Sequence, residues 1–460
     1  MTRSWWRRGL VLLIVLLAAA LLWLRLAPPE LIRVGAGYSA KVVCSNVFIA
    51  GRDAHEVLQV DVQSPGHPLL RLMRVSVDRE QRVVRAGLFA WAGGGLAVAR
   101  DGTGCATVPD GNLAEARRHA GPALPQADTA LAQRPWPAGE HVDAALPAVA
   151  ALLADDKLAG PGFRALLVLH RGRIVAERYA EGFTPATPLL GWSMTKTVTA
   201  ALVGTLVREG RIDIAREGLF PAWAGDGRRA IAMAQLLSMS SGLDFNESYG
   251  SVSDVTRMLY LEPDMAAFAR SKPLAQPVGS HFNYASGSSV LLARLWQDAV
   301  PEGQALAWPR QAIFGPLGMR SAVMEADARG TYVGSSYLYA TGRDWARFAL
   351  WLLQDGHWDG QALLPEGWVA RMRTPSTAAP TEYTDGQMWR HGPRAGTPEG
   401  ENPDAGFALP EDTVWMNGHD GQAIAIVPSR ELAVVRLGLT PSKLQHKPQR
   451  LVQAVLQALH

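Results

Sequence analysis

Ser193 and Lys196 form a Ser-x-x-Lys motif at the expected start of a helix, and their types suit nucleophilic catalysis. Residues three apart lie on one face of a helix, so the hydroxyl and the amine should lie side by side. Serine becomes a good nucleophile when a neighbouring base removes its proton. Lysine can be that base when burial lowers its pKa from about 10.4 towards neutrality. The motif therefore predicts a serine nucleophile with a lysine base.

Lysine is scarce in the rest of the chain, which strengthens this interpretation. Lysine and arginine together number 45, and only six of these are lysine. Arginine stays protonated in proteins and cannot act as a base. A lysine beside Ser193 in a chain that otherwise uses arginine favours chemistry over solvation. The alternative is an ordinary lysine on an exposed helix face.

Two later segments add polar groups and glycines of the kind that an acyl-transfer site needs. The first contains Tyr284-Ala285-Ser286, and the second is Gly418-His419-Asp420-Gly421-Gln422, just before an apolar strand expected over 422–427. A tyrosine near a cationic lysine can share proton handling with it, because the cation stabilises the phenolate. Glycines beside a strand let a substrate lie close to the backbone.

These three motifs, in this order, resemble those of the serine hydrolases of the class C β-lactamase and penicillin-binding-protein type. The resemblance covers roughly residues 150–460, and the segment 236–249 is similar to the branch that contains 6-aminohexanoate-dimer hydrolases and related esterases. It implies an α+β, β-lactamase-like fold, in which an antiparallel sheet is flanked by helices and joined to a mainly helical lobe.

The resemblance also implies a role for each motif residue. Ser193 would form an acyl-enzyme, with Lys196 and Tyr284 as general base and acid. The oxyanion would bind to two backbone N–H groups, those of Ser193 and Gln422. Tyr249 matches a tyrosine that contacts substrate in the aminohexanoate-hydrolase branch, although it could equally cover the core as part of a loop.

The third motif departs from the Lys-Thr-Gly pattern, because it reads His419-Asp420-Gly421. In the family that lysine helps to hold a substrate carboxylate, whereas histidine is mostly neutral at pH 7 and Asp420 would repel an anion. Ser286 likewise replaces the asparagine of the lactamase second motif. We expect a neutral small amide or ester to contact the four residues of these two motifs, namely Ser286, His419, Asp420 and Gly421. His419 could instead be a structural residue.

Two other functions stay open at this stage. One is a β-lactamase or D-alanyl-D-alanine carboxypeptidase, which the altered third motif disfavours. The other is a catalytically silent binding module of the cell envelope, which has no need to keep Ser193, Lys196 and Tyr284 together.

The N-terminus has the pattern of a membrane element. Arg3, Arg7 and Arg8 precede the uncharged apolar run 9–24, and Arg25 follows it. Positive charge before an apolar run places the N-terminus in the cytoplasm. Residues 1–29 are therefore interpreted as an uncleaved signal anchor of the bacterial inner membrane, single-pass, with the catalytic domain in the periplasm. The alternative is a secreted or periplasmic protein after signal cleavage.

Residues 30–120 have a strand-like pattern and are interpreted as a small β-rich region near the membrane. A hairpin is expected from 72–77 and 82–88. In an oxidising compartment the two cysteines, Cys44 and Cys105, can form a disulfide, which would stabilise the fold by about 3–4 kcal/mol. Residues 121–145 are rich in proline and alanine and suit an extended connector.

The main domain is expected over 146–460. Its predicted elements are hairpins at 164–169/174–177 and 422–427/431–437, a helix at 194–209 and a final helix at 448–459. A formal net charge of +3 without a basic stripe argues against nucleic-acid binding. No spacing typical of a metal site occurs, so neither a metal nor a cofactor is expected. The expected partners are a small-molecule amide or ester and the membrane.

Overall fold

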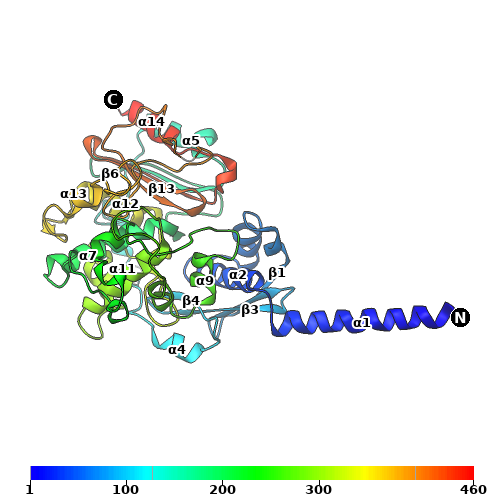
Figure 1. The fold of residues 1–460 in the computed structure, drawn as a ribbon. Coiled ribbons are helices and arrows are strands. Elements are labelled where there is room, and N and C mark those ends of the chain that lie inside the picture. Colours follow the sequence, from blue (N-terminus) through cyan, green and yellow to red (C-terminus); the bar gives the residue numbers. More distant parts are fainter. Residues whose placement is uncertain (1, 127, 399, 460) are drawn as a thin grey trace.

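The computed structural model describes residues 2–126, 128–398 and 400–459. Helix α1 (Thr2–Leu26) projects from a compact body (Figure 1). Its segment Trp6–Leu26 has a mean hydropathy of 2.6, and none of it is buried against the rest of the chain. By length and composition α1 can therefore cross a membrane.

The main domain is built on a five-stranded antiparallel sheet with the order β12-β13-β14-β5-β6. The strands are β5 (Phe163–His170), β6 (Arg173–Tyr179), β12 (Val414–Gly418), β13 (Gln422–Val427) and β14 (Leu432–Gly438). Both predicted hairpins are confirmed. Because β14 pairs with β5, the sheet joins the two ends of the domain.

Helices cover both faces of this sheet (Figure 1). Successive side chains of a strand point to opposite faces. Leu166 and Val168 of β5 pack with α5 (Pro147–Ala154) and α14 (Gln449–Ala458), while Leu167 packs on the opposite side. That opposite side is covered by α12 (Gly342–Leu353). The predicted final helix is thus confirmed as α14.

The helical lobe holds two of the three motifs at helix starts. The longest helices of this lobe are α7 (Thr195–Arg208), which follows Ser193, and α11 (Ser286–Ala299), which follows Tyr284. The helix predicted over 194–209 is therefore confirmed. Shorter helices complete the lobe: α8 (Met233–Leu237), α9 (Asp254–Leu261) and α10 (Met265–Arg270).

The N-terminal region (residues 30–120) contains a four-stranded antiparallel sheet of sequential strands. These are β1 (Met73–Asp78), β2 (Val83–Leu88), β3 (Ala92–Arg100) and β4 (Gly104–Thr107). The predicted hairpin is confirmed, with Asp78 opposite Val83.

The strand-like interpretation is wrong for residues 30–48, which form helix α2 (Glu30–Phe48). Valines favour strands, but α2 is buried on most sides, so its sequence shows no amphipathic period. Small residues allow the close packing: a Cβ on Gly37 would lie 2.9 Å from the Tyr260 carbonyl oxygen, and one on Gly95 would lie 2.2 Å from the Ala36 oxygen. Tertiary packing therefore overrides local propensity here.

A buried ion pair docks α2 onto the main domain. The Lys41 amine pairs with the Glu325 carboxylate, and both side chains are at most 2% exposed. Glu325 also accepts hydrogen bonds from the Ser45 hydroxyl (2.9 Å) and the Cys105 backbone N–H (2.6 Å). The Lys41 Nζ lies 3.9 Å from the ring centroid of Tyr337. Cys105 is disulfide-bonded to Cys44 of α2, as predicted.

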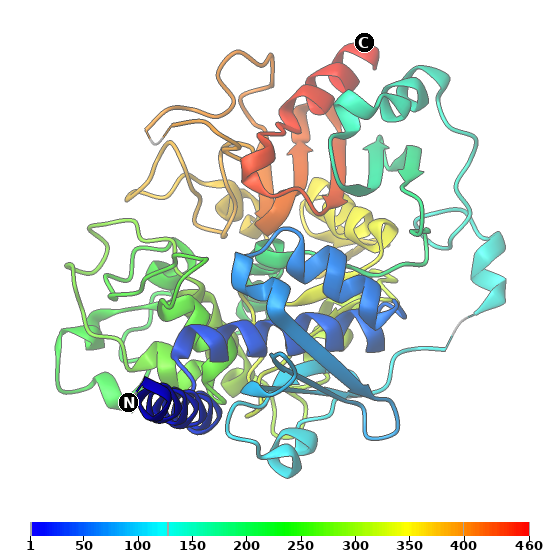
Figure 2. The same ribbon diagram turned by 90° about the vertical axis from the view of Figure 1, so that its right-hand side faces the viewer.

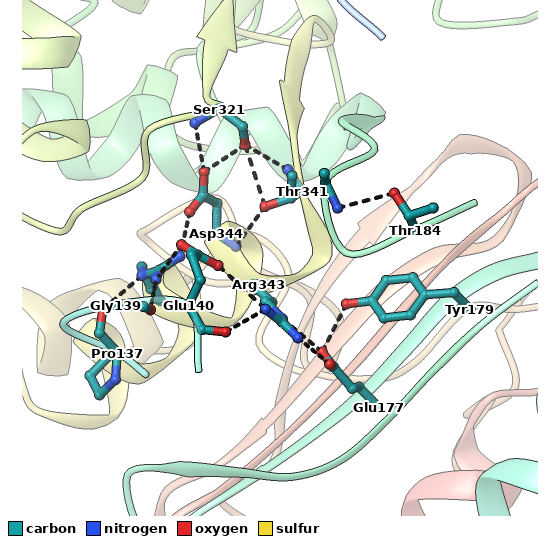
Figure 3. A network of polar contacts seen from close by, with 12 residues as sticks. Pro137, Gly139, Glu140, Glu177, Tyr179, Thr184, Ser321, Thr341, Arg343 and Asp344 are labelled. Atoms are coloured by element: carbon teal, nitrogen blue, oxygen red, sulfur yellow. Dashed lines mark hydrogen bonds and ion pairs between the residues drawn. The ribbon is translucent and has the colours of Figure 1, made fainter. Parts of the chain in front are cut away.

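A second polar network holds the connector against the main domain (Figure 3). Arg343 of α12 donates to the Glu140 carbonyl oxygen (2.6 Å) and to the Glu177 carboxylate of β6 (Nε, 3.0 Å). The neighbouring Asp344 accepts from the Ser321 backbone N–H (2.9 Å) and hydroxyl (2.6 Å). The connector is therefore fastened at its C-terminal end.

Replacing Lys41 by methionine should destabilise the protein by about 3–5 kcal/mol, because Glu325 would keep a buried, unpaired charge. Chemical denaturation of the full chain measures the change. Lys157→Met is the matched control, since Lys157 is exposed. Equal stability of the two variants would contradict a docking role for the ion pair.

Candidate active site

Ser193 stands in a 3₁₀ turn (Trp192–Met194) that leads directly into α7. Its side chain is partly exposed, whereas Lys196 one turn later is only 1% exposed. The Lys196 Nζ donates to the Ser193 Oγ at 3.2 Å. The structure thus brings the two residues of the motif into direct contact.

Trp192 holds the nucleophile's turn in an uncommon conformation. Its φ is +48°, in the left-handed region that costs a non-glycine residue about 1–2 kcal/mol. The indole packs against Tyr337 (ring centroids 5.8 Å apart) and edge-on against His419 (5.5 Å). These ring contacts support the turn that places Ser193 before the first residue of α7.

Burial prepares Lys196 to act as a base. Apart from Ser193, its Nζ donates to the Ser286 Oγ (3.2 Å) and the Ser335 carbonyl oxygen (3.0 Å). Desolvation lowers the pKa of Lys196 to about 8, although the nearby charge of Glu247 acts in the opposite direction. A substantial fraction of this amine is therefore neutral near physiological pH.

Glu247 completes the polar chain behind the lysine, and the sequence argument assigned it no role. Its carboxylate accepts from the Ser286 backbone N–H (2.7 Å) and hydroxyl (2.5 Å). Burial raises the pKa of Glu247, and the Lys196 charge opposes that rise. Its place two residues before Tyr249, in the segment 236–249, was the available signal. Ser286, expected to touch substrate, is fully buried between these two charges.

Tyr284, two residues before α11, lies beside Ser193 and Lys196. The Lys196 Nζ lies 4.7 Å from its ring centroid. Burial, and secondarily the charge of Glu247, raise the pKa of Tyr284. This differs from the expected stabilisation of a phenolate. The phenol stays protonated and is therefore a proton donor in the free enzyme.

The backbone segments that carry the expected oxyanion donors meet through two glycines. A Cβ on Gly418, the last residue of β12, would lie 2.3 Å from the Gly191 carbonyl oxygen, so only glycine permits this approach. Gly191 lies two residues before Ser193, and Gly418 pairs with Gln422, the first residue of β13. The structure thus places the Ser193 turn beside the start of β13.

The third motif forms the tight turn between β12 and β13. Asp420 and Gly421 both have left-handed backbone conformations, with φ of +55° and +83°. A Cβ on Gly421 would lie 2.8 Å from the Thr440 Cβ, so this glycine is required by the turn itself. The His419 Nε2 lies 3.5 Å from the Asp420 Oδ2, and burial raises the pKa of Asp420.

Tyr249 and His419 lie against each other beside the Ser193 turn. Their rings stack with centroids 5.3 Å apart, and both side chains remain partly exposed. Together with Trp192 they line a cleft of about 340 Å³. The side chains expected to contact substrate thus separate into three that line the cleft, Tyr249, His419 and Asp420, and the buried Ser286.

Among the described residues, no group of three or more histidine, cysteine, aspartate or glutamate side chains is placed to hold a metal ion. The polar groups around Ser193 instead form the lysine–serine–glutamate chain given above.

The family model for β-lactamase matches residues 154–456. The chain belongs to the β-lactamase family. Its main domain therefore falls in the serine-hydrolase superfamily that includes β-lactamases and penicillin-binding proteins, as the three motifs predicted.

Individual relatives agree with this assignment. The 6-aminohexanoate-dimer hydrolase of Paenarthrobacter ureafaciens is 26% identical over 221 residues, which are 45% of this chain and 55% of that protein. The chain thus spans about half the length of this curated relative.

Solved structures show the same fold at lower identity. A Bacillus anthracis protein, titled as a candidate 6-aminohexanoate-dimer hydrolase, has a TM-score of 0.54 at 22% identity, with 67% of this chain and 80% of that chain covered. A penicillin-binding protein homologue from Caulobacter crescentus has a TM-score of 0.52 at 17% identity, with 69% and 99% covered. Each match covers about two thirds of this chain, which is about the share that the main domain takes.

The reactivity of Ser193 should follow the titration of Lys196. Reaction of Ser193 with a fluorophosphonate should accelerate about tenfold per pH unit below pH 8 and level off above it, because only the neutral amine accepts the proton. Glu247→Gln removes a charge that raises the pKa of Lys196, so the inflection should move to lower pH. The measurement is the labelling rate as a function of pH.

Asp244→Asn is the matched control for the Glu247 variant, because Asp244 is an exposed carboxylate in the same segment. Its profile should coincide with that of the unmodified protein. An inflection that stays in place in Glu247→Gln would show that this carboxylate does not act on the lysine.

Proposed function

We propose that this protein cleaves a small amide or ester through an acyl-enzyme formed on Ser193. The supporting observation is that the buried Lys196 amine contacts the Ser193 hydroxyl. Burial lowers the pKa of this amine to about 8. A surface lysine would keep its ordinary pKa and serve no base function. The partly exposed position of Ser193 leaves its oxygen accessible to a carbonyl carbon.

The geometry supports the following sequence of steps. Neutral Lys196 accepts the Ser193 proton while Oγ attacks the carbonyl carbon, and the negative charge on the carbonyl oxygen is met by the backbone N–H groups of Ser193 and Gln422. The protonated Tyr284 gives its proton to the departing nitrogen or oxygen, and Lys196 restores it. Water then attacks the acyl-enzyme, with proton transfers in the reverse direction.

Glu247 and Ser286 act through the lysine in this proposal. The Ser286 hydroxyl links Lys196 to Glu247, so that the position of the amine and its pKa are fixed together. Removing the carboxylate changes the pH at which the base works, whereas removing Lys196 abolishes the base. This distinguishes the two positioning residues from the catalytic pair.

The third motif favours a neutral amide or ester over a substrate that depends on its carboxylate. The third motif supplies His419 next to the acidic Asp420 in place of a lysine. One relative of this chain is named as a 6-aminohexanoate-dimer hydrolase, and such a dimer is joined by an amide bond. We therefore place β-lactams and D-alanyl-D-alanine peptides second.

We also propose that α1 anchors this activity to the membrane. Its exposed apolar surface over Trp6–Leu26 supports insertion, and the arginines before the apolar run support a cytoplasmic N-terminus. The main domain would then face the periplasm, where the Cys44–Cys105 disulfide is stable.

Labelling at the nucleophile tests the proposal directly. A fluorophosphonate should attach to Ser193, and Ser193→Ala should lose both the label and p-nitrophenyl-ester hydrolysis, by about 10³-fold or more. Ser280→Ala is the control, because Ser280 is an exposed serine near the second motif. Turnover that persists in Ser193→Ala would exclude this nucleophile.

A substrate panel separates the enzyme alternatives. Amides and esters should be hydrolysed, whereas nitrocefin turnover and covalent penicillin labelling at low concentration should be absent. The reverse result would favour a β-lactamase or carboxypeptidase. Failure of every acyl probe to react would favour the catalytically silent binding module.

A further inference from the structure

The N-terminal region forms one wall of the cleft that is also lined by Trp192, the residue before Ser193. Four cleft-lining residues lie on one face of α2 at helical spacing, namely Leu31, Val34, Gly35 and Tyr38. The segment 65–70 supplies further apolar groups, including Leu69 and Leu70. Figure 2 shows α2 crossing in front of the junction between the helical lobe and the sheet. The family model begins at residue 154, so this wall lies outside the matched part of the chain.

The opposite wall belongs to the active site itself. It contains Trp192, which precedes the nucleophile, and the stacked pair Tyr249 and His419. The remaining lining includes polar side chains, among them His67, Asp420 and Lys443. The cleft is therefore amphipathic, and the residues of α2 that line it are mainly apolar.

The cleft also lies close to the end of the apolar helix. α1 ends at Leu26, and Leu31, in the first turn of α2, already lines the cleft. With α1 in a bilayer, the α2 wall stands next to the membrane surface. An amphiphile held in that surface would meet the apolar wall first.

We propose that the cleft binds the aliphatic chain of the substrate, and that the natural substrate is an amphiphilic ester or amide rather than a small polar dimer. This inference rests on the proposed function. The chain would lie along Leu31, Val34 and Leu69, and the scissile carbonyl would lie past Trp192 at Ser193. A volume of about 340 Å³ is in the range of sites that enclose a small-molecule ligand.

Chain-length dependence tests the assignment. The full chain in phosphatidylcholine nanodiscs is assayed with p-nitrophenyl esters from acetyl to decanoyl, and with acetate esters of alcohols over the same lengths. In at least one series kcat/KM should rise about fourfold for each methylene until the cleft is full. Leu31→Gln and Leu69→Gln should each lower the octanoyl-to-acetyl ratio, or its alcohol equivalent, by about tenfold.

Leu72→Gln is the matched control, because Leu72 is an exposed leucine of the same segment that does not line the cleft. Its ratio should equal that of the unmodified protein. Acetyl-ester turnover should stay unchanged in Leu72→Gln and should vanish in Ser193→Ala. Ratios that are flat in both series, with Ser193-dependent acetyl turnover intact, would overturn the aliphatic-chain assignment and leave the proposed function standing. Acetyl turnover independent of Ser193 would overturn both.

Discussion

The desolvation of one amine sets the conditions for the rest of the site. Lys196 is almost completely buried, and all three hydrogen bonds of its Nζ go to serine oxygens, two hydroxyls and one backbone carbonyl. None of these partners carries a charge that would hold the proton on the lysine. Its pKa therefore falls to about 8, and Glu247, whose charge opposes that fall, is hydrogen-bonded to Ser286. A direct Lys–Glu contact would stabilise the cation and remove the base.

The sequence predicted the parts of the fold whose signals are local. The hairpins, the helix that follows Ser193 and the last helix all have clear periodicity or turn residues, and each is present. Helix α2 escaped prediction because it is packed on nearly every side. Its valines suggest a strand, and the glycines that admit its neighbours weaken the helical signal.

The site was predictable to the extent that its chemistry resides in side-chain types. Ser193 and Lys196 could be named from their spacing, and Tyr284 from the resemblance to the family's motifs. Glu247 could not, because its effect depends on a contact with Ser286 that joins residues far apart in the sequence. For the same reason the sequence did not predict the position of Ser286. Its hydroxyl points into the polar chain rather than towards the cleft. A sequence motif identifies the residues of a site, whereas the packing of the fold decides where their side chains point.

Two aromatic rings connect the buried Lys41 to the turn that carries Ser193. Lys41 of α2 lies over the face of Tyr337, and Tyr337 packs against Trp192, whose left-handed backbone presents Ser193. The Tyr337 hydroxyl also donates to Tyr260, which contacts Tyr38 on α2. The ion pair that docks the N-terminal region therefore supports the turn of the nucleophile as well as the wall of the cleft. Removing that region would expose Tyr337 and release Trp192, so the region outside the family match supports the turn that carries Ser193.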